Sequence, residues 1–90
     1  MATTSQKHRN FVLESMAEKL VTDIAGIGEV YGRRLSSQGY DKASVVLGQF
    51  LLLKRDQELF IDWLKLTAGM STTHATSCHQ CMSDWCNAFL

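Results

Sequence analysis

Three glycines stand within seven positions in the stretch IAGIGEVYGRRL, residues 24–35. A glycine inside a helix costs about 1 kcal/mol relative to alanine, so this stretch must need bare backbone. Glycine supplies conformations closed to other residues and lets a ligand approach the main chain. If Gly26 and Gly28 form a tight turn, the free N–H groups at the start of the next helix make an anion site. The stretch therefore predicts a phosphate-binding turn, with Ile27 inserted into the core between the glycines.

Such a turn either binds the phosphate of a mononucleotide, binds the phosphates of a nucleic-acid backbone, or has a structural role only. A Rossmann site or a P-loop requires a preceding strand, and neither fingerprint is complete here. Short helices on both sides instead fit a helix-hairpin-helix at about residues 20–38, a motif that grips DNA phosphates without reading bases. Lys7, Arg33 and Arg34 are available as counter-charge. Because one hairpin binds weakly, a dimer with two hairpins would hold two duplex segments at once.

A second group of reactive side chains lies near the C-terminus. His74, Cys78 and Cys81 are spaced i, i+4 and i+7, with His79 and Cys86 close by. Cysteine and histidine suit zinc, but structural zinc sites usually draw their ligands from two elements. We therefore favour ordinary thiols and expect no metal or cofactor. The histidines lack a carboxylate and nucleophile constellation, so we expect no enzyme.

Composition limits what surrounds these residues. Nine basic and nine acidic residues cancel, so the overall basic field typical of nucleic-acid binders is missing. The 90 residues are 46% hydrophobic and contain no proline, and strand-like alternation is hard to find, which favours helices. The first ten residues are polar, no apolar run approaches the length of a bilayer span, and three cysteines without a signal peptide indicate free thiols. We expect one soluble, intracellular domain over residues 1–90.

Caps and periodicity predict a compact all-α bundle of five to six short helices. A first helix begins near Thr4 or Ser5 and runs to residue 16, and an irregular stretch follows at 17–20. Further helices are expected at about 21–25, 28–38, 42–53, 57–67 and 72–90. The expected N-caps are Asp41, Asp56 and Ser71 or Thr72, and Gly39 and Gly69 are expected to end helices.

The helix at 42–53 carries apolar side chains around most of its circumference, in the sequence VVLGQFLLL. Such a helix must be buried on nearly every side, and a 90-residue monomer has few places for it. One interpretation is a well-packed internal helix. The other, which we favour, is a surface shared with a second copy of the chain, where Gly48 permits a close approach.

The chain resembles the barrier-to-autointegration factor family, small chromatin and nuclear-envelope proteins of animals. The segments that carry the resemblance are TTSQKHRNFV, AGIGEVYG, GYDKASVVLGQFLLLKRDQELFIDWLK and CMSDWCNAFL. The resemblance implies a compact, SAM-like helical domain that forms a tight homodimer. It also implies that each subunit binds double-stranded DNA without sequence preference through its hairpin, so that the dimer bridges DNA. Implied protein partners are LEM-domain proteins of the inner nuclear membrane, lamin A and histones, with a location in the nucleus and cytoplasm.

The resemblance also assigns residues by position. It implies DNA contacts at Gln6, Lys7, Gly26, Gly28, Val30, Tyr31, Thr72, Thr73 and Thr76. A groove for LEM-domain proteins across the dimer is implied at Leu47, Leu52, Lys54 and Leu59, in the same region as Gly48, Leu51 and Trp63. Phosphorylation is implied at Thr3, Thr4 and Ser5, where added negative charge beside Lys7 would repel the DNA backbone.

This chain departs from the family at two of the implied DNA contacts. Thr73 and Thr76 stand where vertebrate members have lysine and arginine. Losing two cations should weaken DNA affinity and reduce its salt dependence, although a threonine hydroxyl can still donate to a phosphate.

Other departures fall in the loop after the first helix. Ser15 and Leu20 stand where the family usually has proline, and Ala17 replaces a glycine, so we expect a more regular loop. Leu13 stands where a smaller residue is common, close to the implied lamin-facing surface.

Two functional hypotheses follow. The first is a DNA-bridging chromatin protein that links DNA to the nuclear envelope, and the intact AGIGEVYGRR favours it. The second is a dimeric adaptor for LEM-domain proteins with weakened or lost DNA binding, as Thr73 and Thr76 suggest. Under the first hypothesis, Gly26→Glu is expected to abolish DNA binding and spare dimerisation.

Overall fold

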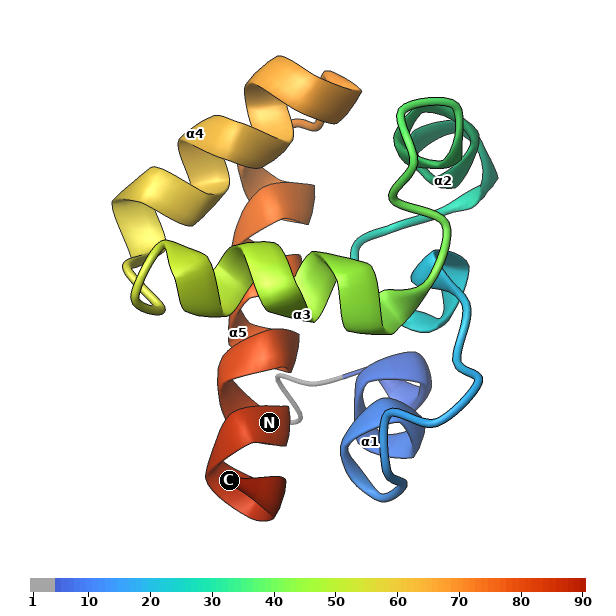
Figure 1. The fold of residues 1–90 in the computed structure, drawn as a ribbon, viewed down its shortest axis with the longest axis vertical. Coiled ribbons are helices and arrows are strands. Elements are labelled where there is room, and N and C mark those ends of the chain that lie inside the picture. The colour runs from blue at the N-terminus through green and yellow to red at the C-terminus, as the bar shows by residue number, and fades with distance from the viewer. Residues whose placement is uncertain (1–4) are drawn as a thin grey trace.

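The computed structural model describes residues 5–90, which form five α-helices and one short 3-10 helix (Figure 1). The elements are α1 (Gln6–Val12), η1 (Val21–Asp23), α2 (Glu29–Ser36), α3 (Ala43–Leu52), α4 (Gln57–Ala68) and α5 (Thr72–Phe89). Over residues 5–90 the only β-type pairing is one isolated bridge between residues 20 and 42, so the prediction of an all-α fold is confirmed. None of the helices within this range is both long and apolar enough to cross a membrane.

Most helix ends lie where the sequence predicts them. Ser5, Asp56 and Ser71 each accept a hydrogen bond from a backbone N–H three residues later. These bonds satisfy donors that the first turn of a helix leaves free. Gly39 follows α2 and Gly69 ends α4, with φ angles of 94° and 67°. Both lie in the left-handed region, where glycine carries no steric cost.

The first helix is shorter than predicted. α1 ends at Val12 and residues 13–19 form turns, bends and irregular chain, so the predicted end of the first helix at residue 16 is wrong. Ala17 keeps a positive φ of 33°, a conformation that suits the family's glycine better than an L side chain. Contacts with the rest of the chain fix the path of the loop: the indole N–H of Trp85 donates to the carbonyl of Glu14 at 2.9 Å. Tertiary packing therefore outweighs local preference here.

The predicted cap of α3 is also wrong. Residues 41 and 42 are extended, and they pair with the chain that enters η1: Val21 N–H donates to the Asp41 carbonyl at 3.1 Å. Lys42 becomes the N-cap, without a side-chain cap, and the N–H of Ala43 is satisfied by the Lys19 carbonyl. The backbone pairing thus replaces the expected Asp41 cap.

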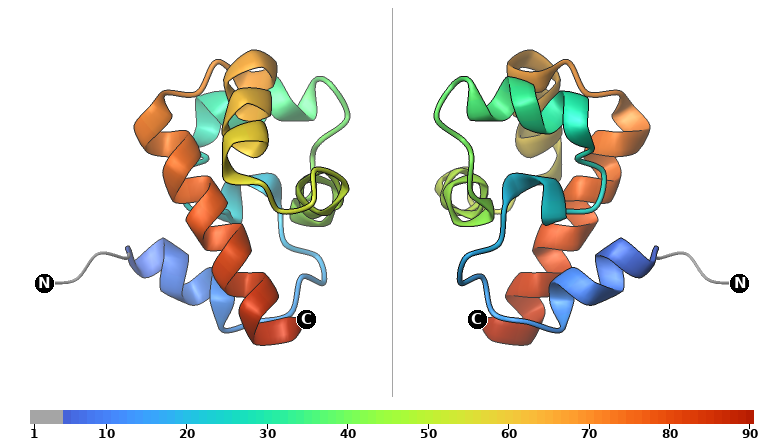
Figure 2. Two further views of the ribbon diagram at one scale, coloured as in Figure 1. Left: turned by 90° about the vertical axis from the view of Figure 1, so that its left-hand side faces the viewer. Right: turned by 90° about the vertical axis from the view of Figure 1, so that its right-hand side faces the viewer.

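The long helix α5 forms the centre of the molecule, and α1 and α4 pack against it (Figures 1 and 2). Its inner face is fully or almost fully buried and is lined by Ala75, Cys78, Cys81, Met82, Trp85 and Cys86. Phe50 of α3 meets Phe60 of α4 edge-on, with ring centroids 4.9 Å apart. The core therefore joins α3, α4 and α5, while α1 closes over the C-terminal half of α5.

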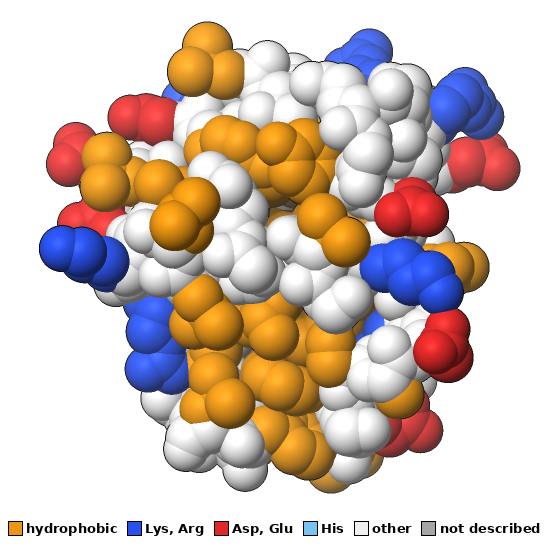
Figure 3. All heavy atoms as spheres, in the orientation of Figure 1, with side chains coloured by type: hydrophobic (Ala, Val, Ile, Leu, Met, Phe, Trp, Pro, Cys, Tyr) orange, Lys and Arg blue, Asp and Glu red, His pale blue; other side chains and the backbone are white. Residues whose placement is uncertain are grey.

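In the single chain, α3 is only half covered. Its buried side chains are Ala43, Val46 and Phe50, whereas Leu51 is 41% and Leu52 is 75% exposed. Val45 of α3 is exposed as well, and further exposed apolar side chains lie on α4 and at the C-terminal end of α5, namely Leu59, Phe89 and Leu90. Figure 3 shows hydrophobic side chains gathered across the middle and lower part of the face on which α3 lies. We call the surface formed by Val45, Leu51, Leu52, Leu59, Phe89 and Leu90 the apolar face.

Candidate nucleic-acid interface

The glycine turn connects η1 to α2 and is anchored by two isoleucines. Ile24 and Ile27 are both fully buried, which confirms that Ile27 inserts into the core. The N–H of Ile27 donates to the Ile24 carbonyl at 3.1 Å and closes a tight turn. Side chains therefore hold the turn from inside, and its outer surface consists largely of main chain.

The three glycines of this segment serve different purposes. Gly26 has a φ of 88°, and a Cβ there would collide with the backbone carbonyl oxygen of His74. Gly32 packs so tightly that a Cβ would strike a methyl group of Thr22. Gly28 has an extended backbone, and a Cβ there would meet nothing within 4 Å. The fold thus requires glycine at positions 26 and 32, whereas Gly28 leaves space open to an approaching molecule.

A depression of about 370 Å³ lies over this turn. It is lined by Lys7, Gly26, Ile27, Gly28, Glu29, Val30, Tyr31 and His74. Three elements meet there: α1 supplies Lys7, α5 supplies His74, and the turn with the start of α2 supplies the rest. We call it the hairpin depression.

Two kinds of donor lie at the hairpin depression, a lysine ammonium group and backbone N–H groups. The ammonium group of Lys7 donates to the Ile27 carbonyl at 2.7 Å, which fixes one cation at the rim. Gly28 is the N-cap of α2 and has no side chain to cap the helix. Free backbone N–H groups and the positive end of the helix dipole attract anions. Together they make a site for an oxyanion, with Glu29 at its edge as the one carboxylate among the lining residues.

Tyr31 and His74 form the wall opposite Lys7's helix. Their rings meet edge-on with centroids 5.5 Å apart, and the Tyr31 hydroxyl lies 3.3 Å from Nδ1 of His74. The Ser71 hydroxyl lies 3.0 Å from the same nitrogen. Sequence reasoning placed His74 only in a possible metal cluster and missed this wall. The available signal was the spacing of three between the cap Ser71 and His74, which brings the imidazole back over the helix start.

The other residues expected to contact DNA lie outside the lining of the depression. Gln6 is hydrogen-bonded along its own helix, to Asn10 at 2.7 Å. Arg33 is exposed, with Glu29 3.9 Å away. Arg34 instead donates to the Ala68 carbonyl at 2.9 Å, so its guanidinium closes the C-terminal end of α4.

The three threonines lie at the start of α5. Thr72 and Thr73 are exposed and Thr76 is half-buried. The Thr76 hydroxyl donates to the Thr72 carbonyl at 2.7 Å, so its proton is already engaged within the helix.

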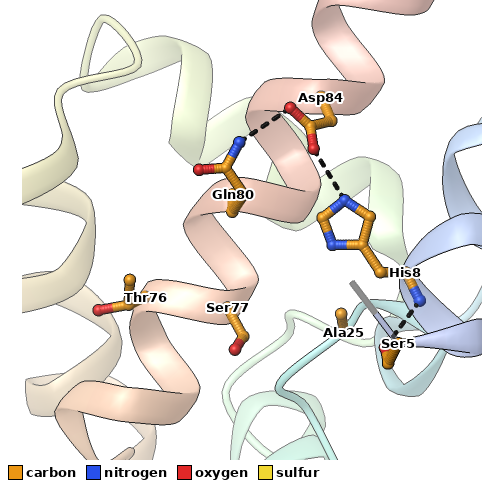
Figure 4. Close-up of a pocket in the computed structure, with 7 residues that line it drawn as sticks. All are labelled: Ser5, His8, Ala25, Thr76, Ser77, Gln80 and Asp84. Carbon is orange, nitrogen blue, oxygen red and sulfur yellow. Dashed lines mark hydrogen bonds and ion pairs between the residues drawn. The ribbon is translucent and has the colours of Figure 1, made fainter. Parts of the chain in front are cut away.

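A second depression has a volume of about 460 Å³ (Figure 4). It is lined by Ser5, His8, Ala25, Thr76, Ser77, Gln80 and Asp84. Nε2 of the buried His8 lies 2.9 Å from a carboxylate oxygen of Asp84, and the Gln80 amide donates to the other oxygen, also at 2.9 Å. The contact between His8 and Asp84 ties α1, which carries Lys7, to α5, and the bond from Gln80 holds the Asp84 carboxylate in place.

The residues expected to bind protein partners lie on or beside the apolar face. Leu51, Leu52 and Leu59 belong to it, and Gly48 is exposed with open space above its Cα. Lys54 is exposed in the α3–α4 turn with a φ of 59°. Leu47 and Trp63 are half-buried, and Trp63 is stacked on Phe60.

The cysteines of α5 are free and buried. Within residues 5–90, no three His, Cys, Asp or Glu side chains gather in a way that could hold a metal ion. Burial raises the pKa of Cys81 to about 11, and burial together with the neighbouring Cys81 raises that of Cys78 well above its ordinary value. Both thiols therefore stay protonated at neutral pH.

Of the expected phosphorylation sites, Thr3 and Thr4 lie outside the described residues. Ser5 is exposed, and its hydroxyl accepts the N–H of His8 at 3.1 Å as the cap of α1.

Comparison with known proteins was made on the full chain. Residues 2–89 match the sequence model of the family described as Barrier to autointegration factor. The chain is 56% identical to the barrier-to-autointegration factor of Danio rerio over 90 residues, 100% of both chains. It is 57% identical to that of Homo sapiens over 88 residues, covering 98% of this chain and 99% of the human one. Identity to the Drosophila melanogaster protein is 54% over 90 residues, again 100% of both. The glycine turn therefore stands in a chain that belongs to the barrier-to-autointegration factor family.

Proposed function

We propose that this chain binds double-stranded DNA without sequence preference, through the hairpin depression. Family membership supports a general role in DNA binding in chromatin, and the family is not a known enzyme family. The observation that carries the proposal is the open space at Gly28, beside the uncapped start of α2 and the fixed ammonium of Lys7.

The expected contacts are to phosphate oxygens. Backbone N–H groups at the start of α2 and the ammonium of Lys7 recognise charge and position, which every duplex presents alike. Val30 is 52% exposed and lies beside them, so it packs against the sugar–phosphate chain. None of these groups distinguishes one base from another, so affinity should not depend on sequence.

The bridging role requires two copies. We propose that the apolar face pairs with its equivalent in a second chain, because exposed leucines on adjacent helices are the kind of surface that homodimers bury. A dimer would carry two hairpin depressions and so bind two duplex segments.

The same face is the proposed site for LEM-domain proteins. Leu47, Leu52, Lys54 and Leu59 combine apolar surface with one cation on α3, the α3–α4 turn and α4. On this proposal the chain links DNA to the inner nuclear membrane, with lamin A and histones as further partners and the nucleus and cytoplasm as its locations. Phosphorylation at Thr3, Thr4 or Ser5 would add negative charge two to four residues before Lys7 and weaken DNA binding.

A second candidate function is a dimeric adaptor with reduced DNA binding. The hydrogen bond from Thr76 to the Thr72 carbonyl favours it, because that hydroxyl has no free proton for a phosphate. Thr73 brings no charge either.

The test is fluorescence anisotropy of unrelated duplexes across a salt series. DNA binding predicts equal affinities, and the logarithm of the binding constant should fall with the logarithm of salt with a slope of about −2 per subunit, from Lys7 and Arg33. A folded dimer that binds no duplex at low salt would refute the DNA proposal and leave the adaptor function. Light scattering of dimer mixed with two labelled duplexes then tests bridging.

A further inference from the structure

The wall of the hairpin depression holds the imidazole of His74, with two hydroxyl groups close to its Nδ1. The Tyr31 hydroxyl accepts the N–H of Ser71 at 3.4 Å, and the Ser71 hydroxyl accepts the N–H of His74 at 3.2 Å. Each hydroxyl therefore has its proton left to donate. For both, the only acceptor among residues 5–90 is Nδ1 of His74, at 3.3 Å and 3.0 Å.

The two hydroxyls and Nδ1 allow more than one arrangement of protons, because each hydroxyl oxygen can also accept a hydrogen bond. When Nδ1 accepts from a hydroxyl, the neutral imidazole must carry its proton on Nε2. Nε2 of His74 has no partner among residues 5–90, and His74 is exposed and lines the hairpin depression. In that form of the ring, an N–H donor lies at the same depression as Lys7 and the start of α2.

We propose that Nε2–H of His74 donates a hydrogen bond to a DNA phosphate, as an uncharged contact of the hairpin. This inference rests on the proposed DNA binding and adds a residue to it. Tyr31 and Ser71 are positioning residues, since they act through the imidazole. The contact gives α5 a hydrogen-bond donor for the phosphate. The Thr76 hydroxyl does not supply one, because it already donates to Thr72, and Thr73 brings no charge.

An uncharged donor and a cation differ in their response to salt. A lysine that neutralises a phosphate releases a counterion, so its loss reduces the slope of affinity against salt by about 0.9, whereas loss of a neutral donor leaves the slope unchanged. The variant His74→Phe keeps a ring against Tyr31 and removes the donor. Lys7→Gln removes the cation, and Lys65→Gln, on exposed surface of α4 outside the depression, is its matched control.

The experiment is anisotropy of one duplex with the four proteins over a salt series. We expect His74→Phe to bind about tenfold more weakly at every salt concentration with an unchanged slope. Lys7→Gln should lose about 0.9 of slope, and Lys65→Gln should match the parent chain. Unchanged affinity of His74→Phe, or a reduced slope, overturns the inference while DNA binding by the parent chain stands. Absence of binding by the parent chain overturns the proposed function itself.

A measurement on the unaltered protein tests the ring directly. In ¹⁵N-labelled protein, correlations between ring protons and nitrogens identify the protonated nitrogen of each histidine. We expect the proton of His74 on Nε2, and a shift of that nitrogen when duplex is added. A proton on Nδ1, or no shift on DNA binding, would overturn the inference even if His74→Phe folds poorly.

Discussion

The hairpin depression and the apolar face are built in opposite ways. In the depression, the polar groups are held by the chain itself: Lys7 by a carbonyl, and His74 by two hydroxyls. On the apolar face, Leu52 and Leu59 are 75% and 52% exposed and are covered by nothing in the single chain. The first surface is prepared by internal bonds and the second is incomplete alone. The difference indicates that one is arranged for a charged ligand and the other for a protein.

The largest expected effect concerns Gly26 and separates residues that maintain the structure of the hairpin depression from residues that face its ligand. Gly26→Ala should lower the free energy of unfolding by about 3 kcal/mol or more, because the new Cβ meets the His74 carbonyl and the φ of 88° is strained. Urea denaturation measures it. Gly26→Glu, considered above as a clean DNA-binding variant, is therefore expected to disturb the fold instead.

Gly28→Ala is the matched variant two residues away. Its Cβ has open space and a negative φ, so stability should change by less than about 1 kcal/mol. DNA affinity should nevertheless fall by about tenfold or more, since the methyl group fills the space reserved for the phosphate chain. Equal stability losses in the two variants would contradict the separation.

The next effect concerns the apolar face. Leu52→Lys should raise the dissociation constant of the dimer by about 100-fold, because a charge must be buried or the contact given up. Leu13→Lys is the control: Leu13 is 76% exposed, as Leu52 is 75%, and each lies at the C-terminal end of a helix. Sedimentation measures both. If neither variant changes the mass in solution, this face is not the dimer contact.

A smaller effect distinguishes the two regions by pH. Cys78 and Cys81 lie beneath the hairpin, where the Ala25 backbone N–H bonds to Cys81. Their pKa values are raised in the fold, so the folded chain holds protons that the unfolded chain has released above pH 9. The contribution of these thiols to stability should therefore be constant below pH 8 and fall from about pH 9 upward, through the Cys81 pKa of about 11.

Hydrogen exchange locates that loss. The amides around the glycine turn should lose protection first as pH rises, after correction for the intrinsic exchange rate, while those of α3 keep theirs. Loss of protection that begins in α3 would place the weak point elsewhere.

The smallest effect lies outside both regions. Ala17→Gly should stabilise the chain by about 1 kcal/mol, because the φ of 33° costs alanine more than glycine loses in unfolded-state entropy. Thermal unfolding measures it, with Ala88→Gly in α5 as a control that should destabilise by a similar amount.

The sequence predicted most of the fold because its signals are local. Caps at Asp56 and Ser71, glycines after helices and apolar periodicity act within a few residues, and those helix ends are confirmed. The errors occur where distant backbone decides. α1 ends early because Trp85 of α5 holds the following loop through the Glu14 carbonyl. Asp41 does not cap α3, because its carbonyl pairs with the N–H of Val21.

The site was predicted in part for the same reason. The turn, Ile27 and Lys7 follow from residue type and spacing. The role of Gly26 could not be read from the sequence, because its neighbour is a carbonyl on α5. Arg34 was assigned by charge, and only the structure shows its guanidinium on the Ala68 carbonyl.

The seating of Gly26 on α5 also has a consequence for biosynthesis. The turn is translated before the backbone that supports it, from His74 to Cys78. Since contacts of such large sequence separation form only after both partners are available, the nascent chain cannot complete its hairpin until α5 has left the ribosome. A chain truncated before α5 should therefore display a glycine turn without its support, and the anion site becomes functional only when α5 is present.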